Sequence, residues 1–277
     1  MPDPTVHRAY AGLRDGQVHF AACGPPQGQA VLLLHQTPRS WAEYAAVLPI
    51  LGARYRAIAM DTAGFGDSFV PRWPPSIERW AAVAVELLDA LGIARAHVVG
   101  HHTGGVIAVE LAAAHPGRVD RLVLSSTPFT DAAFRRERAA RPPIDEVAMQ
   151  ADGSHLAQLW QRRQPFYPQQ RPELLAAFVL DALKAGGRLE DGHRAVARYR
   201  MEDRIARVRQ PVLVIRAGAD PFASPHAQAL CALLPQAALH DIPHGMVPLP
   251  DQLPEEFAAA VLAFLDPARG PPQRQLR

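Results

Sequence analysis

Short apolar runs alternate with longer amphipathic segments along most of this chain. The runs that have the length of buried strands lie at 31–34, 56–60, 96–100, 122–125 and 211–215. Segments with helical spacing follow several of them, for example residues 76–91 and 103–115. Strand–helix alternation of this kind predicts a mostly parallel central sheet with helices on both faces, so we expect an α/β fold.

The alternation stops between residues 128 and 209, where amphipathic patches are interrupted by prolines and glycines and no strand-like run occurs. A structureless loop of that length would be unusual in a compact domain. We therefore expect a core formed by residues 1–127 and 210–266, with 128–209 inserted as a helical cap. The cap should cover the carboxyl edge of the sheet, where open α/β sheets bind their ligands.

The two ends of the chain carry weaker signals. Apolar alternation near residues 5–11 and 17–22 predicts an antiparallel pair of strands at one edge of the sheet. Residues 267–277 are polar and rich in proline, and we expect them to form a flexible tail.

Composition excludes several classes of protein. The 277 residues include 29 Lys+Arg and 27 Asp+Glu, so the net charge of +2 gives no reason to expect nucleic acid or an anionic membrane as a partner. The chain is 48% hydrophobic and 20% charged, which is typical of a globular protein. No run reaches the roughly 20 apolar residues of a membrane span, and two cysteines cannot form a disulfide scaffold. We expect a cytoplasmic protein, bacterial in character, with a small-molecule substrate and no cofactor; a homodimer is left open.

The most informative segment extends from Val98 to Gly105. It is a strand followed by Gly100-His-His-Thr-Gly104 and then by a helix. The two glycines permit a tight turn, and the residue between them, His102, should project beside the positive end of the helix. This is the frame of the G-x-S-x-G nucleophile elbow, with histidine in place of serine.

Together with further segments in the right order, the elbow resembles the α/β-hydrolase superfamily. His35-Gln-Thr-Pro38 is similar to the family's oxyanion turn, with Gln36 in place of glycine, and residues 61–68 are similar to its D-x-x-G-x-G-x-S loop. Asp220 and His244 stand where the family has its acid and its base, and the insertion at 128–209 is similar to its cap domain.

The resemblance implies a role for each of these residues. His244 would be the general base and Asp220 would hold its imidazole in one tautomer. Backbone N–H groups of Thr37 and Thr103 would form the oxyanion hole. Asp131, after the strand at 122–125, is a second candidate for the acid.

We expect the pocket to include residues near these motifs, namely His35, Gln36, Trp41, Phe129, Asp131 and Trp160. His35 is interpreted as a hydrogen-bonding residue beneath the oxyanion turn. Gln36 either enters the pocket as a donor or points to solvent. Asp61 and Ser68 are expected to stabilise their own loop.

His102 leaves the reaction open between several hypotheses. Imidazole can attack a carbonyl or activate water, so the first is hydrolysis of an ester, lactone, amide or C–C bond at an atypical site of His102, Asp220 and His244. The second is a cofactor-free lyase, decarboxylase or oxygenase, which needs a base and an anion hole but no serine. The third is a binding protein that has lost catalysis.

A metal site is the remaining alternative, because His35, His101, His102 and His244 could all lie near the pocket and zinc readily takes three histidines. Adjacent residues on a tight turn should point in opposite directions. We therefore expect one packed and one exposed histidine at 101–102, and no metal.

Overall fold

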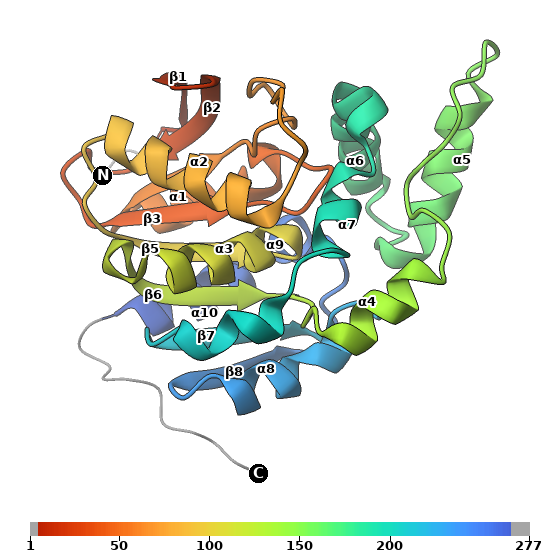
Figure 1. The fold of residues 1–277 in the computed structure, drawn as a ribbon. Helices are drawn as coiled ribbons and strands as arrows, with labels where there is room; N and C mark the ends of the chain where they lie inside the picture. Colours follow the sequence, from red (N-terminus) through yellow and green to blue (C-terminus); the bar gives the residue numbers. More distant parts are fainter. Residues whose placement is uncertain (1–4, 267–277) are drawn as a thin grey trace.

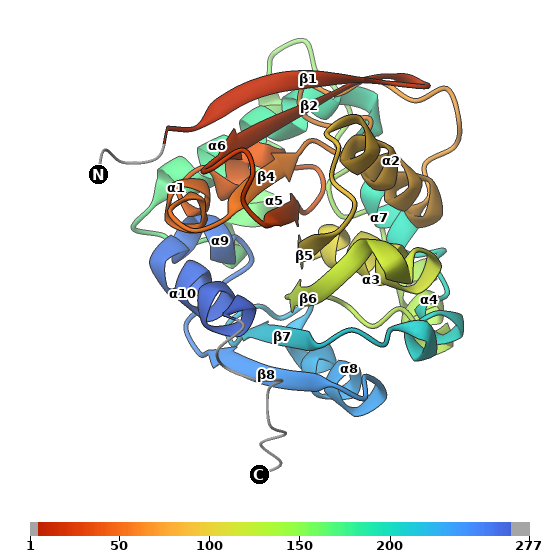
Figure 2. The ribbon, with the colours of Figure 1, turned by 90° about the vertical axis from the view of Figure 1, so that its left-hand side faces the viewer.

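The computed structural model describes residues 5–266, and these form an eight-stranded sheet in the order β1-β2-β4-β3-β5-β6-β7-β8 (Figures 1 and 2). The strands are β1 His7–Leu13, β2 Gly16–Cys23, β3 Ala30–Leu34, β4 Arg56–Met60, β5 Ala96–His101, β6 Val119–Ser125, β7 Val212–Ala217 and β8 Ala237–Ile242. β2 pairs antiparallel with β1 and β4, and β3 to β8 are parallel. The predicted α/β fold and its antiparallel edge are confirmed. The predicted tail, 267–277, lies outside the described residues.

Helices cover both faces of the sheet. Apolar side chains of α2 (Ile77–Ala90), α3 (Thr103–Ala114) and α8 (Ala227–Leu233) pack on one face. Those of α1 (Val47–Gly52) and α10 (Pro254–Leu265) pack on the other, next to α9 (Leu249–Gln252). No described helix combines the length and the apolar character needed to cross a lipid bilayer.

Strand β3 shows why the central strands are continuous apolar runs. Leu32 and Leu34 belong to the cluster with α2, α3 and α8, whereas Val31 and Leu33 belong to the cluster with α1 and α10. Successive side chains of a strand point to opposite faces. Both faces are covered here, so every position must be apolar. Each side chain of this kind contributes about 1.5–3 kcal/mol when it is fully buried.

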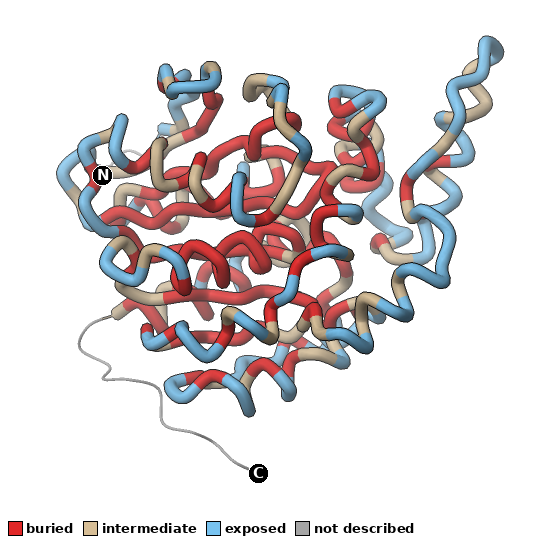
Figure 3. The backbone as a smooth tube through the Cα atoms, in the orientation of Figure 1, coloured by how far each residue is buried: buried red, intermediate tan, exposed pale blue. Residues whose placement is uncertain are grey.

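The described chain between β6 and β7 contains helices and turns but no strand. Its α-helices are α4 (Ala132–Ala139), α5 (Ser154–Arg163), α6 (Pro172–Ala185) and α7 (Asp191–Val196). They lie together beyond the carboxyl ends of the parallel strands, on the right of Figure 1. Figure 3 shows that α5 and its adjoining loop are mostly exposed, in contrast to the sheet. These helices, called the cap below, cover the edge at which α/β folds bind ligands.

A buried arginine connects the cap to the core. Arg39 is 1% exposed and donates from Nε to Asp181 on α6 at 2.9 Å and from Nη1 to Asp251 on α9 at 2.6 Å. The hydroxyl of Ser40 donates to the other oxygen of Asp181 at 2.9 Å. Burial would lower the pKa of Arg39, but the surrounding acidic groups hold it above its ordinary value. The guanidinium therefore stays charged and holds α6 against the loop that follows β3.

Candidate active site

His102 occupies the sharp turn between β5 and α3. Its φ of 48° and ψ of −114° place a non-glycine residue in a region that costs about 1–3 kcal/mol. Glycines make the turn possible, because a Cβ on Gly104 would lie 1.9 Å from the carbonyl oxygen of Leu34. A Cβ on Gly100 would lie 2.3 Å from the carbonyl oxygen of Gly104. The tight turn expected from the glycine spacing is present, with His102 at its apex.

The imidazole of His102 meets the carboxylate of Asp220. Nε2 lies 2.8 Å from Oδ2, where the carboxylate side chain is completely buried and the ring is 14% exposed. The two atoms are at ion-pair distance but outside the alignment of a hydrogen bond. Catalytic contacts are often poorly aligned before a substrate is bound. Because Nε2 faces Asp220, Nδ1 is the nitrogen left for other partners.

Asp220 lies in the loop after β7, where backbone donors hold its carboxylate. The N–H groups of Phe222 and Ala223 donate to Oδ1 at 2.9 Å and 3.3 Å. Burial alone would raise the pKa of Asp220, but the neighbouring His102 and the Phe222 N–H outweigh burial and lower it. The site therefore presents His102 with an ionised, fixed carboxylate.

His101, beside the elbow, is a structural residue. Its Nε2 lies 2.8 Å from the carbonyl oxygen of Val247, which can only accept, so Nε2 carries the proton. Nδ1 then accepts from the hydroxyl of Ser125 at 3.0 Å. Burial, together with the positive charge that His102 can carry, lowers the pKa of His101 to about 3. This neutral ring packs edge-on against His102, with the ring centroids 4.7 Å apart.

His244 does not join the site, which corrects the expected pairing of His244 with Asp220. Its side chain is 63% exposed, and Nε2 lies 3.2 Å from Oε1 of Glu256 on α10. From the loop after β8 it is instead the buried Val247 that lines the same cavity as His102. Asp220 is therefore paired with His102, and the three-residue arrangement expected from the sequence becomes a two-residue one.

The oxyanion turn lies against the start of α3. The hydroxyl oxygens of Thr37 and Thr103 are 2.9 Å apart, and both residues are buried. Thr103 is the first residue of α3, so its N–H belongs to the helix end that has no intrahelical acceptor. The structure thus brings together the two residues expected to form the oxyanion hole.

Gln36 borders the cavity but its amide points into the protein. Its backbone N–H donates to Oε2 of Glu43 at 2.9 Å, and its Nε2 donates to Oε1 of the same carboxyl at 2.5 Å. Glu43 is fully buried, and burial raises its pKa to about 8 although Arg39 opposes the shift. The residue that replaces the family's glycine therefore anchors the oxyanion turn.

His35 lies beneath that turn, as interpreted from the sequence. Its Nδ1 donates to the carbonyl oxygen of Gln36 at 2.7 Å, and its Nε2 accepts from the N–H of Thr62 at 2.9 Å. Burial lowers the pKa of His35. Both ring nitrogens are committed to the backbone, so His35 is a structural residue and does not line the cavity.

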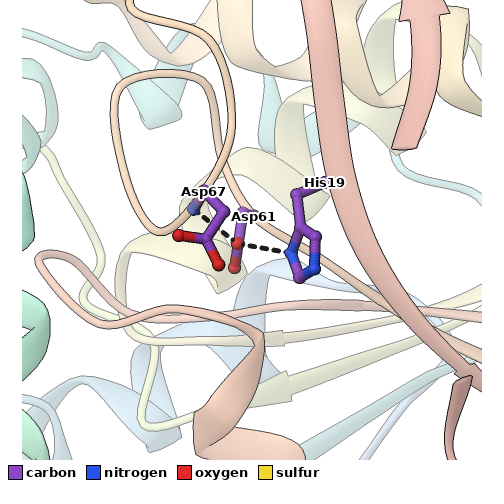
Figure 4. Close-up of side chains that lie close together, drawn as sticks. All are labelled: His19, Asp61 and Asp67. Atoms are coloured by element: carbon purple, nitrogen blue, oxygen red, sulfur yellow. Dashed lines mark hydrogen bonds and ion pairs between the residues drawn. The ribbon is translucent and has the colours of Figure 1, made fainter. Parts of the chain in front are cut away.

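The loop at 61–68 is held by a separate histidine–carboxylate cluster (Figure 4). Nδ1 of His19 lies 2.8 Å from Oδ2 of Asp61, which also accepts from the N–H of Asp67 at 2.9 Å. The hydroxyl of Ser68 donates to the carbonyl oxygen of Asp61 at 2.7 Å. The predicted loop-stabilising roles of Asp61 and Ser68 agree with these contacts.

Other residues expected in the pocket have different positions. Asp131 caps α4 by accepting from the N–H of Phe134 at 2.8 Å, so it does not orient a catalytic histidine. Trp41 packs with the cluster under α1 and α10, Phe129 with the cluster on the opposite face, and Trp160 with the cluster inside the cap. These large apolar side chains are half-buried and pack against the edges of the apolar clusters, away from the cavity.

A cavity of about 510 Å³ lies between the cap and the elbow. The core contributes Gln36, Thr37, His102, Thr103 and Val247 to its wall, and Pro221, Phe222, Pro225 and His226 line it from the segment after Asp220. The cap contributes Phe134, Glu137, Arg138, Ile144, Arg163 and His193, among others. Its volume suits a small molecule, and the side chain of His102, which is 14% exposed, forms part of its wall.

Sequence reasoning missed the polar cluster in the cap wall. Nε2 of His193 lies 2.9 Å from Oδ2 of Asp145, whose carboxylate also pairs with the guanidinium of Arg163. Asp145 and Arg163 are buried. These residues lie far apart in a segment without motifs, so no local spacing identifies them.

The histidines considered for a metal do not gather around His102. His35 and His101 have both ring nitrogens hydrogen-bonded, and His244 lies at the surface. Two other groups of described residues have the close spacing of metal ligands: His19 with Asp61 and Asp67, and Asp145 with Glu190 and His193. In each group one carboxylate is already paired with a cationic side chain: Asp67 with Lys184 in the first group, and Asp145 with Arg163 in the second.

Comparison with known proteins gives one family and several relatives. The profile of the alpha/beta hydrolase fold matches residues 29–246. The chain is 38% identical over 129 residues to epoxide hydrolase B of Mycobacterium tuberculosis, across 45% of this chain and 36% of that protein's length. It is 29% identical over 274 residues to a putative carbamate hydrolase, RutD, of a Caulobacter species, across 92% and 97% of the two chains. A solved hydrolase from Pseudomonas aeruginosa superposes with a TM-score of 0.78 at 25% identity, over 94% of this chain and 98% of that one.

Proposed function

Because this chain belongs to the α/β-hydrolase fold family, we propose that it hydrolyses a small carbonyl compound by means of the His102–Asp220 pair. The observation that carries the proposal is the 2.8 Å contact between Nε2 of His102, which lines the cavity, and Oδ2 of the buried Asp220. An ester, lactone, amide, carbamate or activated C–C bond provides the carbonyl. The name of the Caulobacter relative supports the inclusion of carbamates.

In this proposal His102 acts as a general base toward water. Asp220 holds the Nε2–H tautomer, so Nδ1 has the lone pair that accepts a proton from a water molecule in the cavity. The oxygen of that water attacks the carbonyl carbon, and the carbonyl electron pair moves onto oxygen. Direct attack by imidazole would give a labile acyl-imidazole, and the base role avoids it.

The developing oxyanion is stabilised beside the elbow. Backbone N–H groups of Thr37 and Thr103 are the proposed donors, and the N-terminal end of α3 adds a favourable dipole. Collapse of the tetrahedral intermediate breaks the bond to the leaving group, which takes its proton from the His102 imidazolium. His102 is then ready for another cycle, with Asp220 ionised throughout.

A non-hydrolytic reaction is the second candidate, because the residue at the apex of the elbow, His102, has an imidazole where a serine or cysteine would supply a hydroxyl or thiol nucleophile. The same base and anion hole could remove a proton next to a carbonyl. This alternative predicts exchange of that proton with deuterium in heavy water, without consumption of an ester.

The test is a panel of activated esters, lactones, carbamates, amides and epoxides, the last because of the name of the Mycobacterium relative. We expect turnover of an acyl compound by the wild type, its loss in His102→Gln, and its retention in His244→Gln, whose side chain is exposed and away from the cavity. Full activity of His102→Gln would refute the proposal. A cytoplasmic location and a homodimer stay predictions from sequence.

A further inference from the structure

Two histidines that are each paired with a buried carboxylate line one cavity, and the proposed hydrolysis uses only one of these pairs. The first is His102 with Asp220, at 2.8 Å, from the core. The second is His193 on α7 with Asp145, at 2.9 Å, from the cap. His102 and His193 both form part of the cavity wall. The second pair therefore needs a role of its own.

The charges around His193 indicate which ring nitrogen carries the proton. Asp145 is buried, and its carboxylate receives Nε of Arg163 at 2.6 Å as well as Nη2 of the same side chain. Burial alone would raise the pKa of Asp145, but Arg163 and His193 hold it well below its ordinary value. An ionised carboxylate only accepts hydrogen bonds, so it selects the tautomer of His193 with the proton on Nε2.

Arg163 also limits the charge of this cluster. Its Nη2 approaches Nε2 of His193 to 3.2 Å, an approach that is not a hydrogen bond when Nε2 carries the proton. Arg163 matches the negative charge of Asp145. The other carboxylate near His193, that of Glu190, accepts from the backbone N–H groups of residues 144 and 145 and lies 3.4 Å from the guanidinium of Arg138. The arrangement therefore does not require an imidazolium. The neutral ring then has its lone pair on Nδ1. Among the described residues, none hydrogen-bonds to Nδ1.

His193 is also close to the proposed reaction centre. Gly192 packs so tightly on the oxyanion turn that a Cβ there would lie 1.7 Å from Oγ1 of Thr37. Thr37 in turn contacts Thr103, with 2.9 Å between their hydroxyl oxygens, and Thr103 follows His102. One wall of the cavity therefore continues from His102 through the oxyanion turn to His193.

We propose that Nδ1 of His193 is a hydrogen-bond-accepting subsite, which selects substrates that carry a hydroxyl or N–H donor close to the reacting carbonyl. This inference rests on the proposed hydrolysis only for the location of that carbonyl. Asp145 and Arg163 are positioning residues, because they hold the tautomer and the orientation of the ring. A substrate donor satisfies the lone pair of Nδ1, whereas an analogue that lacks the donor leaves a desolvated acceptor without a partner.

The experiment compares an ester that carries a hydroxyl donor with one in which a methyl group masks that donor. These are the 4-nitrophenyl esters of 3-hydroxybutanoate and 3-methoxybutanoate, assayed with the full chain. We expect the wild type to prefer the hydroxy ester by about tenfold or more in kcat/KM, because sites that hydrogen-bond a substrate hydroxyl discriminate strongly against its absence. The matched methyl ketones, which have no leaving group, are measured by calorimetry and should show the same preference in Kd.

Two conservative variants separate the ring nitrogens of His193. In His193→Asn the amide oxygen can occupy the position of Nδ1, so the preference should be largely retained. In His193→Gln the amide lies at the position of Nε2, so the preference should fall to within about threefold of unity while the methoxy ester is still hydrolysed. Retained bidentate pairing of Asp145 with Arg163 keeps the charges balanced in both variants.

The outcomes distinguish the subsite from the reaction. Ketone binding that prefers the hydroxyl, without turnover of either ester, supports the subsite and overturns the hydrolysis. Turnover without a preference, or a preference that His193→Gln keeps and His193→Asn loses, overturns the subsite and leaves the hydrolysis in place. Failure of the wild type to bind or convert any of the four compounds overturns both.

Discussion

Nε2 of His102 lies 2.8 Å from Oδ2 of Asp220, so the residue at the elbow contacts the acid directly. The sequence led us to expect a third residue, His244, between them. Because the elbow residue is itself an imidazole, it can occupy both the place of the nucleophile and the place next to the acid. This relationship carries the proposed reaction, and the first two predictions test it.

Asp220→Asn should lower kcat by about 10³–10⁴-fold, because an amide no longer selects the tautomer with the lone pair on Nδ1. KM should change little if substrate does not touch this side chain. Steady-state kinetics on an acyl substrate identified by the panel measure both. Asp131→Asn is the matched control, since Asp131 only caps α4. An unchanged kcat in Asp220→Asn would contradict the assignment.

His102→Ser should not produce a serine esterase, because removing the imidazole leaves Asp220 without a histidine and His244 remains at the surface. We expect no burst of product and an ester hydrolysis rate at or below that of His102→Ala. Stopped-flow measurement with a 4-nitrophenyl ester tests this. A gain of turnover with accumulation of an acyl-enzyme would show that another base can reach the elbow.

Stability should fall as the pH decreases from about 6.5, because His101 must stay neutral when folded. Its pKa is lowered to about 3 by burial and by His102, whereas in the unfolded chain it has the ordinary value of about 6.5. Between these values the unfolded state binds more protons, so the free energy of unfolding decreases by up to about 1.4 kcal/mol per pH unit lost. Urea titrations from pH 8 to 5 measure this slope. His101→Gln should reduce this slope without abolishing it, because burial also lowers the pKa of His97 to about 4. An equally steep slope in that variant would assign the whole effect to other groups.

Gly192→Ala should reduce both stability and activity, because the new Cβ would lie 1.7 Å from Oγ1 of Thr37 and must displace α7 or the oxyanion turn. Overpacking of this kind costs about 1–3 kcal/mol. Gly187→Ala is the control in the same region, since a Cβ there meets nothing within 4 Å. Equal melting temperatures and equal kcat in the two variants would argue against tight packing of α7 on the oxyanion turn.

Asp181→Ala should destabilise the protein by about 3–5 kcal/mol, because it leaves the buried Arg39 guanidinium without one of its two carboxylate partners. Loosening of α6 should also make the cap more sensitive to proteolysis. Chemical denaturation and limited trypsin digestion measure the two effects. Asp203→Ala, which breaks only an exposed pair with Arg200, should change stability by less than about 1 kcal/mol.

The order of elements and the elbow could be predicted from local patterns. Buried strands such as β3 are continuous apolar runs because helices cover both faces of the sheet. Residues 100 and 104 must be glycine because a Cβ at either position would collide with the backbone. The apolar spacing of residues 41–51 suits one continuous helix, but the structure divides this segment into a 3-10 turn, Trp41–Tyr44, and α1. Propensity alone does not place such a break.

The site could be predicted only in part. Motifs correctly brought His102, Asp220, Thr37 and Thr103 to one edge, because each follows the carboxyl end of a strand or begins a helix there. The expected pocket wall was mostly wrong, since Trp41, Phe129 and Trp160 pack against apolar clusters and do not line the cavity. The polar wall instead comes from His193, in the cap, where pairing depends on how helices dock.

Sequence by itself determined that this chain forms an α/β core with a histidine at the apex of its elbow. The apolar runs of the strands and the glycines of the elbow are local patterns, so residues close together in the chain are enough to specify them. Only the tertiary structure decided that Asp220 faces His102, that His244 turns to solvent, and that His193 joins the cavity from the cap. The physical reason is that the direction of a side chain on a loop depends on the backbone turn and on the elements packed against it. Those contacts connect residues that no local pattern relates.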